Sequence, residues 1–305
     1  TRLSGTRTKI DESKSIALVG CGSLGSKIGM HLTRNGNGPF LCVDDDIFMP
    51  HNNARHALSL TWAQNKAELL TLSMFSTSGI ASEAIRTSAY KVDYSKSRII
   101  IDTTASLSVQ NYFLAKTDLP PVIACRLYAG GRFGLVLLEN KIKTSRLIDI
   151  WAHLYSESLE KKTIRKILFS STNTNSILIG QSCSSQTMVG DDALISLISS
   201  SMSLKIQNCL ENGLPENGEI SFLSYNENYS LNTNTLSVPK STAIESTSSK
   251  EWKVLITEPV SKKLKAAMLR KSPNETGGVL LGTVFMFAKT MIVTNILDAP
   301  PDSIE

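Results

Sequence analysis

Histidine, cysteine and long apolar runs are scarce in this chain of 305 residues, and each scarcity excludes a class of protein. The five cysteines are odd in number and never form a CxxC pair, which argues against both a disulfide framework and a structural zinc site. No apolar run approaches the roughly 20 residues of a membrane helix, and no basic-then-apolar leader opens the chain. We therefore expect a soluble protein of the reducing cytoplasm that does not bind membranes.

Charge of one sign is not concentrated anywhere along the chain. Lys and Arg total 32 against 27 for Asp and Glu, and no block of five or six like charges occurs. This balance does not support nucleic-acid binding. Hydrophobic residues make up 41% and charged residues 19%, which is typical of globular proteins, and the length suggests about two domains.

The first strong pattern is a predicted strand at 15–19, a glycine-rich turn at 20–25 and a helix that stops at Asn35-Gly36. A second strand at 39–43 completes the opening of a βαβ unit. Strands and helices continue to alternate as far as 138. This order predicts an α/β fold with a doubly wound, mainly parallel sheet.

Two polar segments divide the rest of the chain. Residues 170–190 form a Ser, Thr and Asn-rich loop, and 224–250 reads as a domain linker. We expect a first domain at 1–223 and, after the linker, a smaller α+β domain at 251–305, with a strand, an amphipathic helix and two further strands.

The glycine-rich turn is a candidate phosphate site. Gly20, Gly22 and Gly25, with Ser23 and Leu24 between them, would let a phosphate approach the backbone at a helix N-terminus. Asp44 ends the next strand, where an acid can bind ribose hydroxyls. This pattern alone predicts nucleotide binding and would also suit a dehydrogenase.

The residues that follow the second strand distinguish between classes of nucleotide-binding protein. Asp44-Asp45-Asp46 is followed by Asn52-Asn53-Ala54-Arg55-His56 and then by Lys66. In this order the elements resemble the ThiF/MoeB/ubiquitin-activating enzyme superfamily, over roughly residues 15–210. The resemblance implies a Rossmann-like adenylation domain that uses ATP and Mg²⁺. A dehydrogenase would not need these additional residues and is the most distant alternative.

The resemblance gives each polar residue a role that fits its chemistry. Arg55 offers a planar charged fork for phosphate oxygens, Lys66 offers a mobile point charge, and Asn52 can hold a phosphate or ribose oxygen. Asp46 would serve the ribose or the metal.

The expected magnesium ligand is replaced in this chain. Relatives carry a second aspartate three residues after the one matching Asp102, where this chain has Ala105. Magnesium would then be held by Asp102, by Asp44 or Asp46, or mainly by ATP oxygens.

Cys183 is the candidate nucleophile. It lies among small polar residues before a predicted helix, at the position where related enzymes carry the cysteine that forms a thioester, and a helix N-terminus would lower its pKa. The alternative is a chance cysteine in a loop. The other cysteines are expected to be buried structural residues: Cys21, Cys42, Cys125 and Cys209.

Residues 274–282 resemble the opening of the JAMM (JAB) zinc-dependent isopeptidase domain, in which Glu275 would be the general acid/base. That family also needs an H-x-H-P element, yet no histidine follows His153. The metal set is therefore incomplete, Zn²⁺ is expected only if a complete JAMM domain lies beyond residue 305, and peptidase activity is not expected.

Together the resemblances imply a bacterial activating enzyme that adenylates the C-terminal carboxylate of a ubiquitin-like β-grasp protein and then forms a thioester. A conjugating-enzyme-like partner, a homodimer and a setting in antiphage defence are implied in the same way. One alternative is an activator of sulfur-carrier proteins, as in thiamine or molybdopterin synthesis, although CxxC pairs are absent and the JAMM-like tail is present. The other is a non-catalytic scaffold that binds nucleotide or modifier, which Ala105 would favour.

Overall fold

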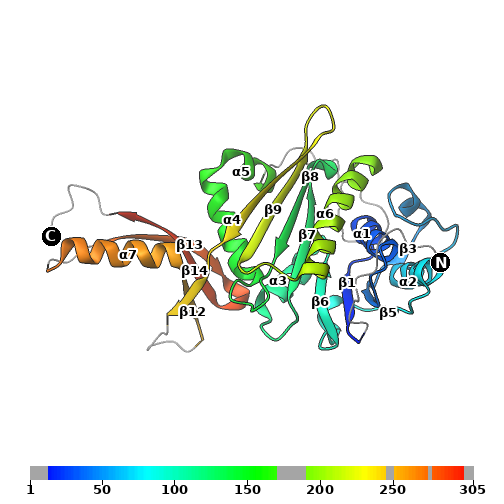
Figure 1. Ribbon diagram of the computed structural model, residues 1–305, viewed down its shortest axis with the longest axis horizontal. Helices are drawn as coiled ribbons and strands as arrows, with labels where there is room; N and C mark the ends of the chain where they lie inside the picture. Colours follow the sequence, from blue (N-terminus) through cyan, green and yellow to red (C-terminus); the bar gives the residue numbers. More distant parts are fainter. Residues whose placement is uncertain (1–12, 170–189, 245–250, 274–276, 299–305) are drawn as a thin grey trace.

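A single eight-stranded sheet forms the centre of the molecule (Figure 1). The computed structural model describes residues 13–169, 190–244, 251–273 and 277–298. The strand order is β10-β9-β8-β7-β6-β1-β2-β5; strands from β5 to β7 run parallel, and β8, β9 and β10 are added antiparallel. The strands are β1 (Ser15–Val19), β2 (Phe40–Val43), β5 (Glu83–Ile85), β6 (Ser97–Asp102), β7 (Val122–Tyr128), β8 (Phe133–Leu138), β9 (Gly218–Tyr225) and β10 (Leu231–Val238).

Helices cover both faces of this sheet, so its central strands are apolar on both sides. In β1, Ile16 and Leu18 join the core beneath one set of helices, while Ala17 and Val19 join the core on the opposite face. The first set is α1 (Ser23–Arg34), α2 (Lys66–Ser78) and α6 (Asp192–Asn212). The second is α3 (Leu107–Ala115) and α4 (Leu147–Glu160), followed by α5 (Lys162–Phe169).

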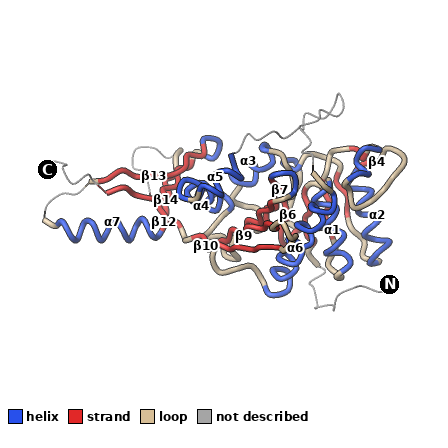
Figure 2. Tube along the Cα trace, turned by 90° about the horizontal axis from the view of Figure 1, so that it is seen from above, coloured by secondary structure: helices blue, strands red, loops and turns tan. Residues whose placement is uncertain are grey.

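A second sheet of four strands stands beside α4, as Figure 2 shows from above. Its order is β11-β12-β14-β13, formed by β11 (Ser241–Ile244), β12 (Lys253–Thr257), β14 (Thr290–Asp298) and β13 (Gly278–Phe285). Helix α7 (Glu258–Lys271) packs on it through Val260, against Ile256 and Val293. Phe285 and Ile292 belong to the large core cluster that also contains residues of α4, so this sheet is joined to the main one by apolar packing.

The predicted fold class is confirmed, with one local difference in the chain's second half. The segment 224–250, predicted as a linker, contains β10 at the edge of the large sheet and β11 at the edge of the small one. Both are exposed along most of their length, so their polar composition lacks the apolar alternation that marks a strand. The division into two domains remains a prediction.

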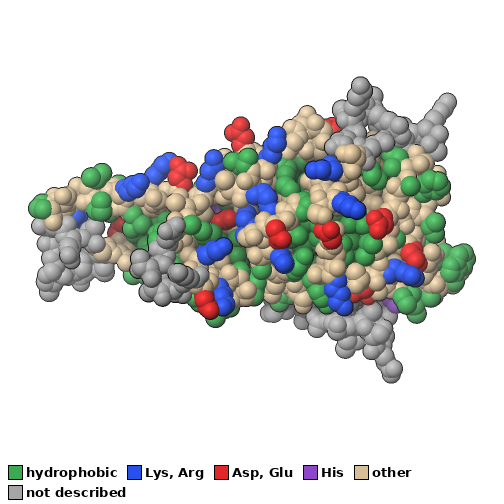
Figure 3. All heavy atoms as spheres, turned by 90° about the horizontal axis from the view of Figure 1, so that it is seen from below, with side chains coloured by type: hydrophobic (Ala, Val, Ile, Leu, Met, Phe, Trp, Pro, Cys, Tyr) green, Lys and Arg blue, Asp and Glu red, His purple; other side chains and the backbone are tan. Residues whose placement is uncertain are grey.

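Short elements complete the connections: β3 (Ile47–Phe48), β4 (Gln64–Asn65), and the 3₁₀ turns η1 (Pro50–Ala54), η2 (Ala89–Lys91), η3 (Ala129–Gly131) and η4 (Met286–Ala288). None of the helices within the described ranges is long and apolar enough to cross a bilayer. On the face drawn in Figure 3, basic and acidic side chains are interspersed.

Candidate functional site

The carboxyl end of β1 is the place where this type of sheet binds ligands. β1 has β2 on one side and β6 on the other, so the connections that leave their carboxyl ends diverge there. The glycine turn joins β1 to α1 at this edge. Gly20 N donates to Val43 O of β2 (2.9 Å), and Thr103 N, just after β6, donates to Val19 O (2.9 Å). The turn is therefore anchored to both neighbouring strands.

The three glycines of the turn serve different needs. Gly20 has a φ of +86°, which favours glycine. A Cβ on Gly25 would lie 1.8 Å from Gly20 O, so no side chain fits between the turn and α1. A Cβ on Gly22 would meet nothing within 4 Å. Gly22 thus faces open space, as a position that a ligand approaches must.

The N-terminus of α1 presents backbone donors to that space. Its N-cap residue is Gly22, which has no side chain to accept from the first turn. Among the described residues, none accepts a hydrogen bond from the N–H groups of Gly22 or Ser23. Such N–H groups, together with the helix dipole, favour an anion. Leu24 contributes its backbone alone, because its side chain is buried in the core.

Asp44 is brought to the turn as predicted, and it binds the turn directly. One carboxylate oxygen accepts from Cys21 N (2.6 Å) and the other from Asp46 N (2.8 Å). Burial raises the pKa of Asp44, while the Lys66 ammonium and these two N–H donors oppose the shift. Asp44 therefore holds the end of β2 against the glycine turn.

Lys66 lies beside the same carboxylates. It begins α2, where the side chain of Asn65 caps the helix by accepting from Ala67 N (3.0 Å) and Glu68 N (3.2 Å). Lys66 Nζ lies 2.7 Å from Asp46 Oδ2, and the Lys66 side chain is 12% exposed. The structure thus brings Lys66, Asp44 and Asp46 together, although Lys66 is paired with an acid that the sequence assigned to ribose or metal.

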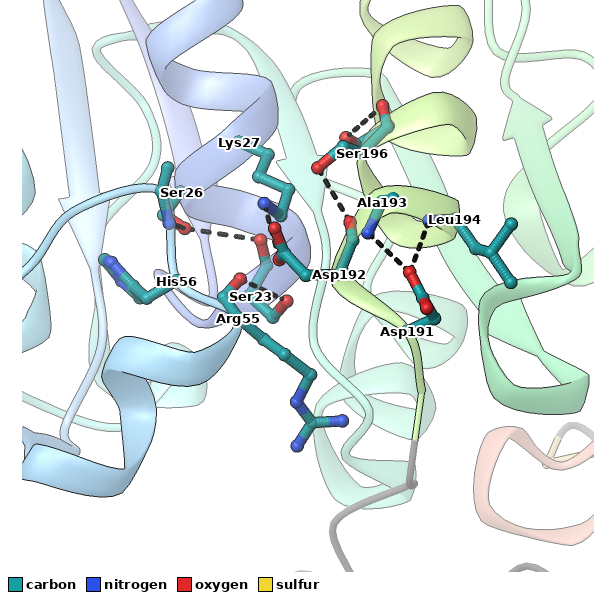
Figure 4. Close-up of polar contacts among 12 residues, drawn as sticks. Ser23, Ser26, Lys27, Arg55, His56, Asp191, Asp192, Ala193, Leu194 and Ser196 are labelled. Atoms are coloured by element: carbon teal, nitrogen blue, oxygen red, sulfur yellow. Dashed lines mark hydrogen bonds and ion pairs between the residues drawn. The ribbon is translucent and has the colours of Figure 1, made fainter.

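The turn η1 carries Asn52 and Arg55 past the N-terminus of α1. Asn52 Oδ1 accepts from Met49 N (2.8 Å) and closes the turn. Ser23 Oγ donates to Arg55 O (2.8 Å), which fixes the Arg55 backbone at the start of α1. In Figure 4 the guanidinium group of Arg55 extends away from Ser23, on the side where α6 begins.

His56 is a site residue that sequence reasoning did not assign. Its Nδ1 accepts from Leu58 N (3.2 Å), so Nε2 carries the proton and donates to Cys21 O (2.8 Å). The ring stands edge-on to Phe48, with centroids 4.9 Å apart. Burial, assisted by the charges of Lys66 and Lys27, lowers the pKa of His56 to about 4. A neutral His56 therefore clamps the turn at Cys21 O.

Asp102 is sealed inside the fold. One of its carboxylate oxygens pairs with Arg126 Nη2, and the other accepts from Thr104 N (3.0 Å) and Thr104 Oγ1 (2.8 Å). Asp102 is fully buried. Arg126, another residue not anticipated from the sequence, also donates to Asp102 O (3.0 Å). Direct contact between Asp102 and a nucleotide or a metal would require this arrangement to open.

Oxygen donors suited to a hard cation are available nearby. In the described part of the chain, one group of acids can offer ligand atoms within 4.8 Å of one another: Asp44, Asp45 and Asp46. Carboxylate oxygens are the ligands that Mg²⁺ prefers. Asp45 at present accepts from Ser88 Oγ (2.7 Å). This donor set fits Mg²⁺ better than the enclosed Asp102.

Two predicted site residues, Cys183 and Glu275, lie outside the described residues. The four cysteines within the described ranges are buried. A hydrogen bond with Cys42 together with burial raises the pKa of Cys21, and burial raises that of Cys125 to about 12 and that of Cys209 to about 11. These thiols are poor nucleophiles, as expected for structural cysteines.

The sheet order and the glycine turn between β1 and α1 define a Rossmann-like α/β protein, and solved structures share that fold. MccB of E. coli superposes with a TM-score of 0.51 at 12% identity, covering 75% of this chain and 63% of MccB. PaaA gives a TM-score of 0.50 at 15% identity, covering 74% of each chain.

Sequence similarity is confined to a short segment. The chain is 40% identical over 67 residues to the ATP-dependent ubiquitin transferase-like protein Cap2 of Vibrio cholerae, and 44% identical over 63 residues to Cap2 of Escherichia coli strain TW11681. Each match covers 19% of this chain, and they cover only 12% and 10% of those proteins. No family model matches. The solved structures thus share the fold of this chain, and the similarity to Cap2 is limited to about a fifth of it.

Gly22 and Gly25 allow a matched test of this geometry. We expect Gly25→Ala to lower the free energy of unfolding by about 3 kcal/mol or more, because its methyl group would collide with Gly20 O. Gly22→Ala should cost less than about 1 kcal/mol, because its methyl group enters open space. Urea unfolding of both variants measures the difference, and equal losses would contradict this account of the turn.

The neutral state of His56 predicts a pH dependence. Its pKa is lower in the folded protein than its ordinary value of 6.5, so the unfolded chain binds more protons and stability is lost as pH falls from 6.5 toward 4. This residue should account for a loss of about 2 kcal/mol between about pH 7 and pH 5. His56→Gln keeps a donor for Cys21 O and does not titrate. This variant should therefore lack the loss of stability that His56 causes between about pH 7 and pH 5.

Urea unfolding at the two pH values, compared between wild type and variant, provides the measurement. The matched control is His51→Gln, because His51 is exposed. If His56→Gln loses as much stability on acidification as the wild type, the neutral-clamp assignment is wrong.

Proposed function

We propose that the chain adenylates the C-terminal carboxylate of a ubiquitin-like protein with ATP and then transfers the acyl group to Cys183. The observation that carries this proposal lies at the N-terminus of α1, where no described residue accepts from the N–H groups of Gly22 or Ser23 and a side chain on Gly22 would enter open space. The Arg55 carbonyl accepts from Ser23 Oγ at this N-terminus, and Lys66 pairs with Asp46 at the end of the neighbouring strand. Backbone donors close to cationic residues favour a polyphosphate.

The first step would be attack of a carboxylate oxygen of the modifier on the α-phosphorus of ATP. An oxygen–phosphorus bond forms, the bond from the α-phosphorus to the bridging oxygen breaks, and pyrophosphate leaves. The chain's part is to position the phosphates and to stabilise the charge that moves onto the leaving group. Lys66 and Arg55 would supply positive charge, and the α1 N-terminus would supply oriented N–H donors.

Mg²⁺ would neutralise phosphate charge when bound, and Asp44, Asp45 and Asp46 are the residues that would hold it. Lys66 then has a second use. Its ammonium group pairs with Asp46 and its side chain is 12% exposed, so it keeps a cation close to three acids in an enclosed place. Without that charge, the acids would repel a polyphosphate from the glycine turn.

In the second step, the thiolate of Cys183 would attack the acyl carbon. A carbon–sulfur bond forms, the bond from that carbon to the AMP oxygen breaks, AMP leaves, and the thiol proton goes to solvent. The buried state of the other four cysteines supports Cys183 as the acceptor. A conjugating-enzyme-like protein would take the acyl group next, in a bacterial pathway of the antiphage type that similarity to Cap2 supports.

Removing the charge of Arg55 or of Lys66 should suppress adenylation. We expect Arg55→Ala and Lys66→Ala each to reduce modifier-dependent ATP–pyrophosphate exchange by about 100-fold, because each removes charge that stabilises the transition state. Lys162→Ala, which removes an exposed charge on α5, is the control and should retain exchange. Exchange at the wild-type rate in both site variants would refute the phosphate site.

Removing the acceptor thiol should separate the two steps. Cys183→Ala should keep exchange within about twofold and lose the reducible modifier adduct, because adenylation precedes thioester formation. Mass spectrometry with and without dithiothreitol detects the adduct. An undiminished adduct in Cys183→Ala would place the acyl group elsewhere. Exchange without any adduct in the wild type would favour the sulfur-carrier alternative, whereas nucleotide binding without exchange would favour a scaffold.

A further inference from the structure

Thr103, the residue that follows β6, reaches into the glycine turn with its side chain. Its Oγ1 donates to Gly20 O (2.6 Å) and also lies within hydrogen-bond distance of Val19 O (3.1 Å). A Cβ built on Gly25 would be 1.8 Å from Gly20 O and 2.5 Å from Thr103 Oγ1. The hydroxyl of Thr103, the carbonyl of Gly20 and the backbone of Gly25 therefore meet at one point of the turn.

The position of Thr103 is fixed from outside the turn. Asp102, the residue before it, is fully buried, and its carboxylate pairs with Arg126 of β7. The same carboxylate accepts from Thr104 N (3.0 Å) and Thr104 Oγ1 (2.8 Å), so the residue after Thr103 is held as well. A buried network whose members are all paired is rigid. The hydroxyl of Thr103 is therefore presented to the turn from a fixed segment.

The open N–H groups of the turn depend on where Gly20 O lies. Gly22 and Ser23 follow Gly20 closely in the chain, and no described residue accepts from their N–H groups. A hydrogen bond weakens steeply as its donor angle narrows, so a small displacement of the turn would weaken both bonds to an incoming anion together. The Thr103 hydroxyl thus controls the aim of donors that belong to other residues.

We infer that Thr103 is a positioning residue for the phosphates of ATP. This inference rests on the proposed function, in which the glycine turn holds those phosphates during adenylation. A threonine hydroxyl has one proton to donate, and in Thr103 this proton is used on the turn. Thr103 therefore acts through the backbone of the turn and not as a donor to the nucleotide.

Three substitutions of Thr103 separate the effect of its hydroxyl from that of its methyl group. Thr103→Ser keeps the hydroxyl, and Thr103→Ala removes it without filling its place. Thr103→Val puts a methyl carbon where the oxygen lies 2.6 Å from Gly20 O, well inside an ordinary contact of about 3.5 Å, so the turn must move. Thr103→Ala remains informative if Thr103→Val fails to fold.

Thr33→Val is the matched control. Thr33 is buried near the end of α1, and its Oγ1 donates to Gly29 O (2.8 Å). This variant also exchanges a threonine hydroxyl on a glycine carbonyl for a methyl group, but at the end of the helix away from the glycine turn. It should lose stability without losing affinity for nucleotide.

Calorimetric titration with ATP and Mg²⁺, in the absence of modifier, measures the dissociation constant. We expect this constant to rise at least about 10-fold in Thr103→Val and Thr103→Ala, because the N–H donors of the turn lose their alignment. It should stay within about threefold of wild type in Thr103→Ser and within about twofold in Thr33→Val. Wild-type affinity in both Thr103→Val and Thr103→Ala would overturn the inference. An equal loss of affinity in Thr103→Ser or in Thr33→Val would overturn it too.

The same titration distinguishes failure of this inference from failure of the proposed function. A wild-type chain that binds ATP but shows no modifier-dependent ATP–pyrophosphate exchange would refute adenylation, while the comparison of affinities would still decide the role of Thr103. A wild-type chain that binds no ATP would overturn both.

Discussion

The glycine turn can serve as a ligand platform because its own backbone groups are already occupied by the protein on every side but one. Thr103 Oγ1 donates to Gly20 O (2.6 Å), Asp44 accepts from Cys21 N, and His56 donates to Cys21 O. These hydrogen bonds come from residues just after β6, just after β2 and just after η1. A turn fixed in this way does not reorganise when charge arrives, which is the condition for strong electrostatic stabilisation.

The same ties explain the protonation states around the turn. His56 donates through Nε2 while its Nδ1 accepts from Leu58 N, so a second proton would have to displace a backbone donor in a buried position. Asp44 accepts two backbone N–H bonds close to Lys66, which favours its charged form against the cost of burial. The imidazole beside the turn is thus neutral, and the positive charge near the turn comes from Lys66 and Arg55.

Features made by residues close together in the chain could be predicted from the sequence, whereas contacts between distant segments could not. The glycines, Asp44 and the α/β order follow from local patterns in which a strand, a turn and a helix are consecutive, and the structure has that order. Arg126 with Asp102 and Lys27 with Asp192 join elements distant in the chain, and no periodicity marks such pairs. The strand β10 was not predicted because it lies at an exposed edge of the sheet, where polar residues form a strand as well as apolar ones do.

The ends of β6 and β2 differ in net charge. At the end of β6, Arg126 neutralises the buried carboxylate, so that edge contributes little net charge to a ligand. At the end of β2, by contrast, three consecutive acids face a single ammonium from Lys66. The acidic side and the open N–H groups of α1 are therefore on neighbouring parts of one edge. A cation bound by the acids would lie next to an anion bound by the helix, and this is the arrangement that a metal-bound polyphosphate needs.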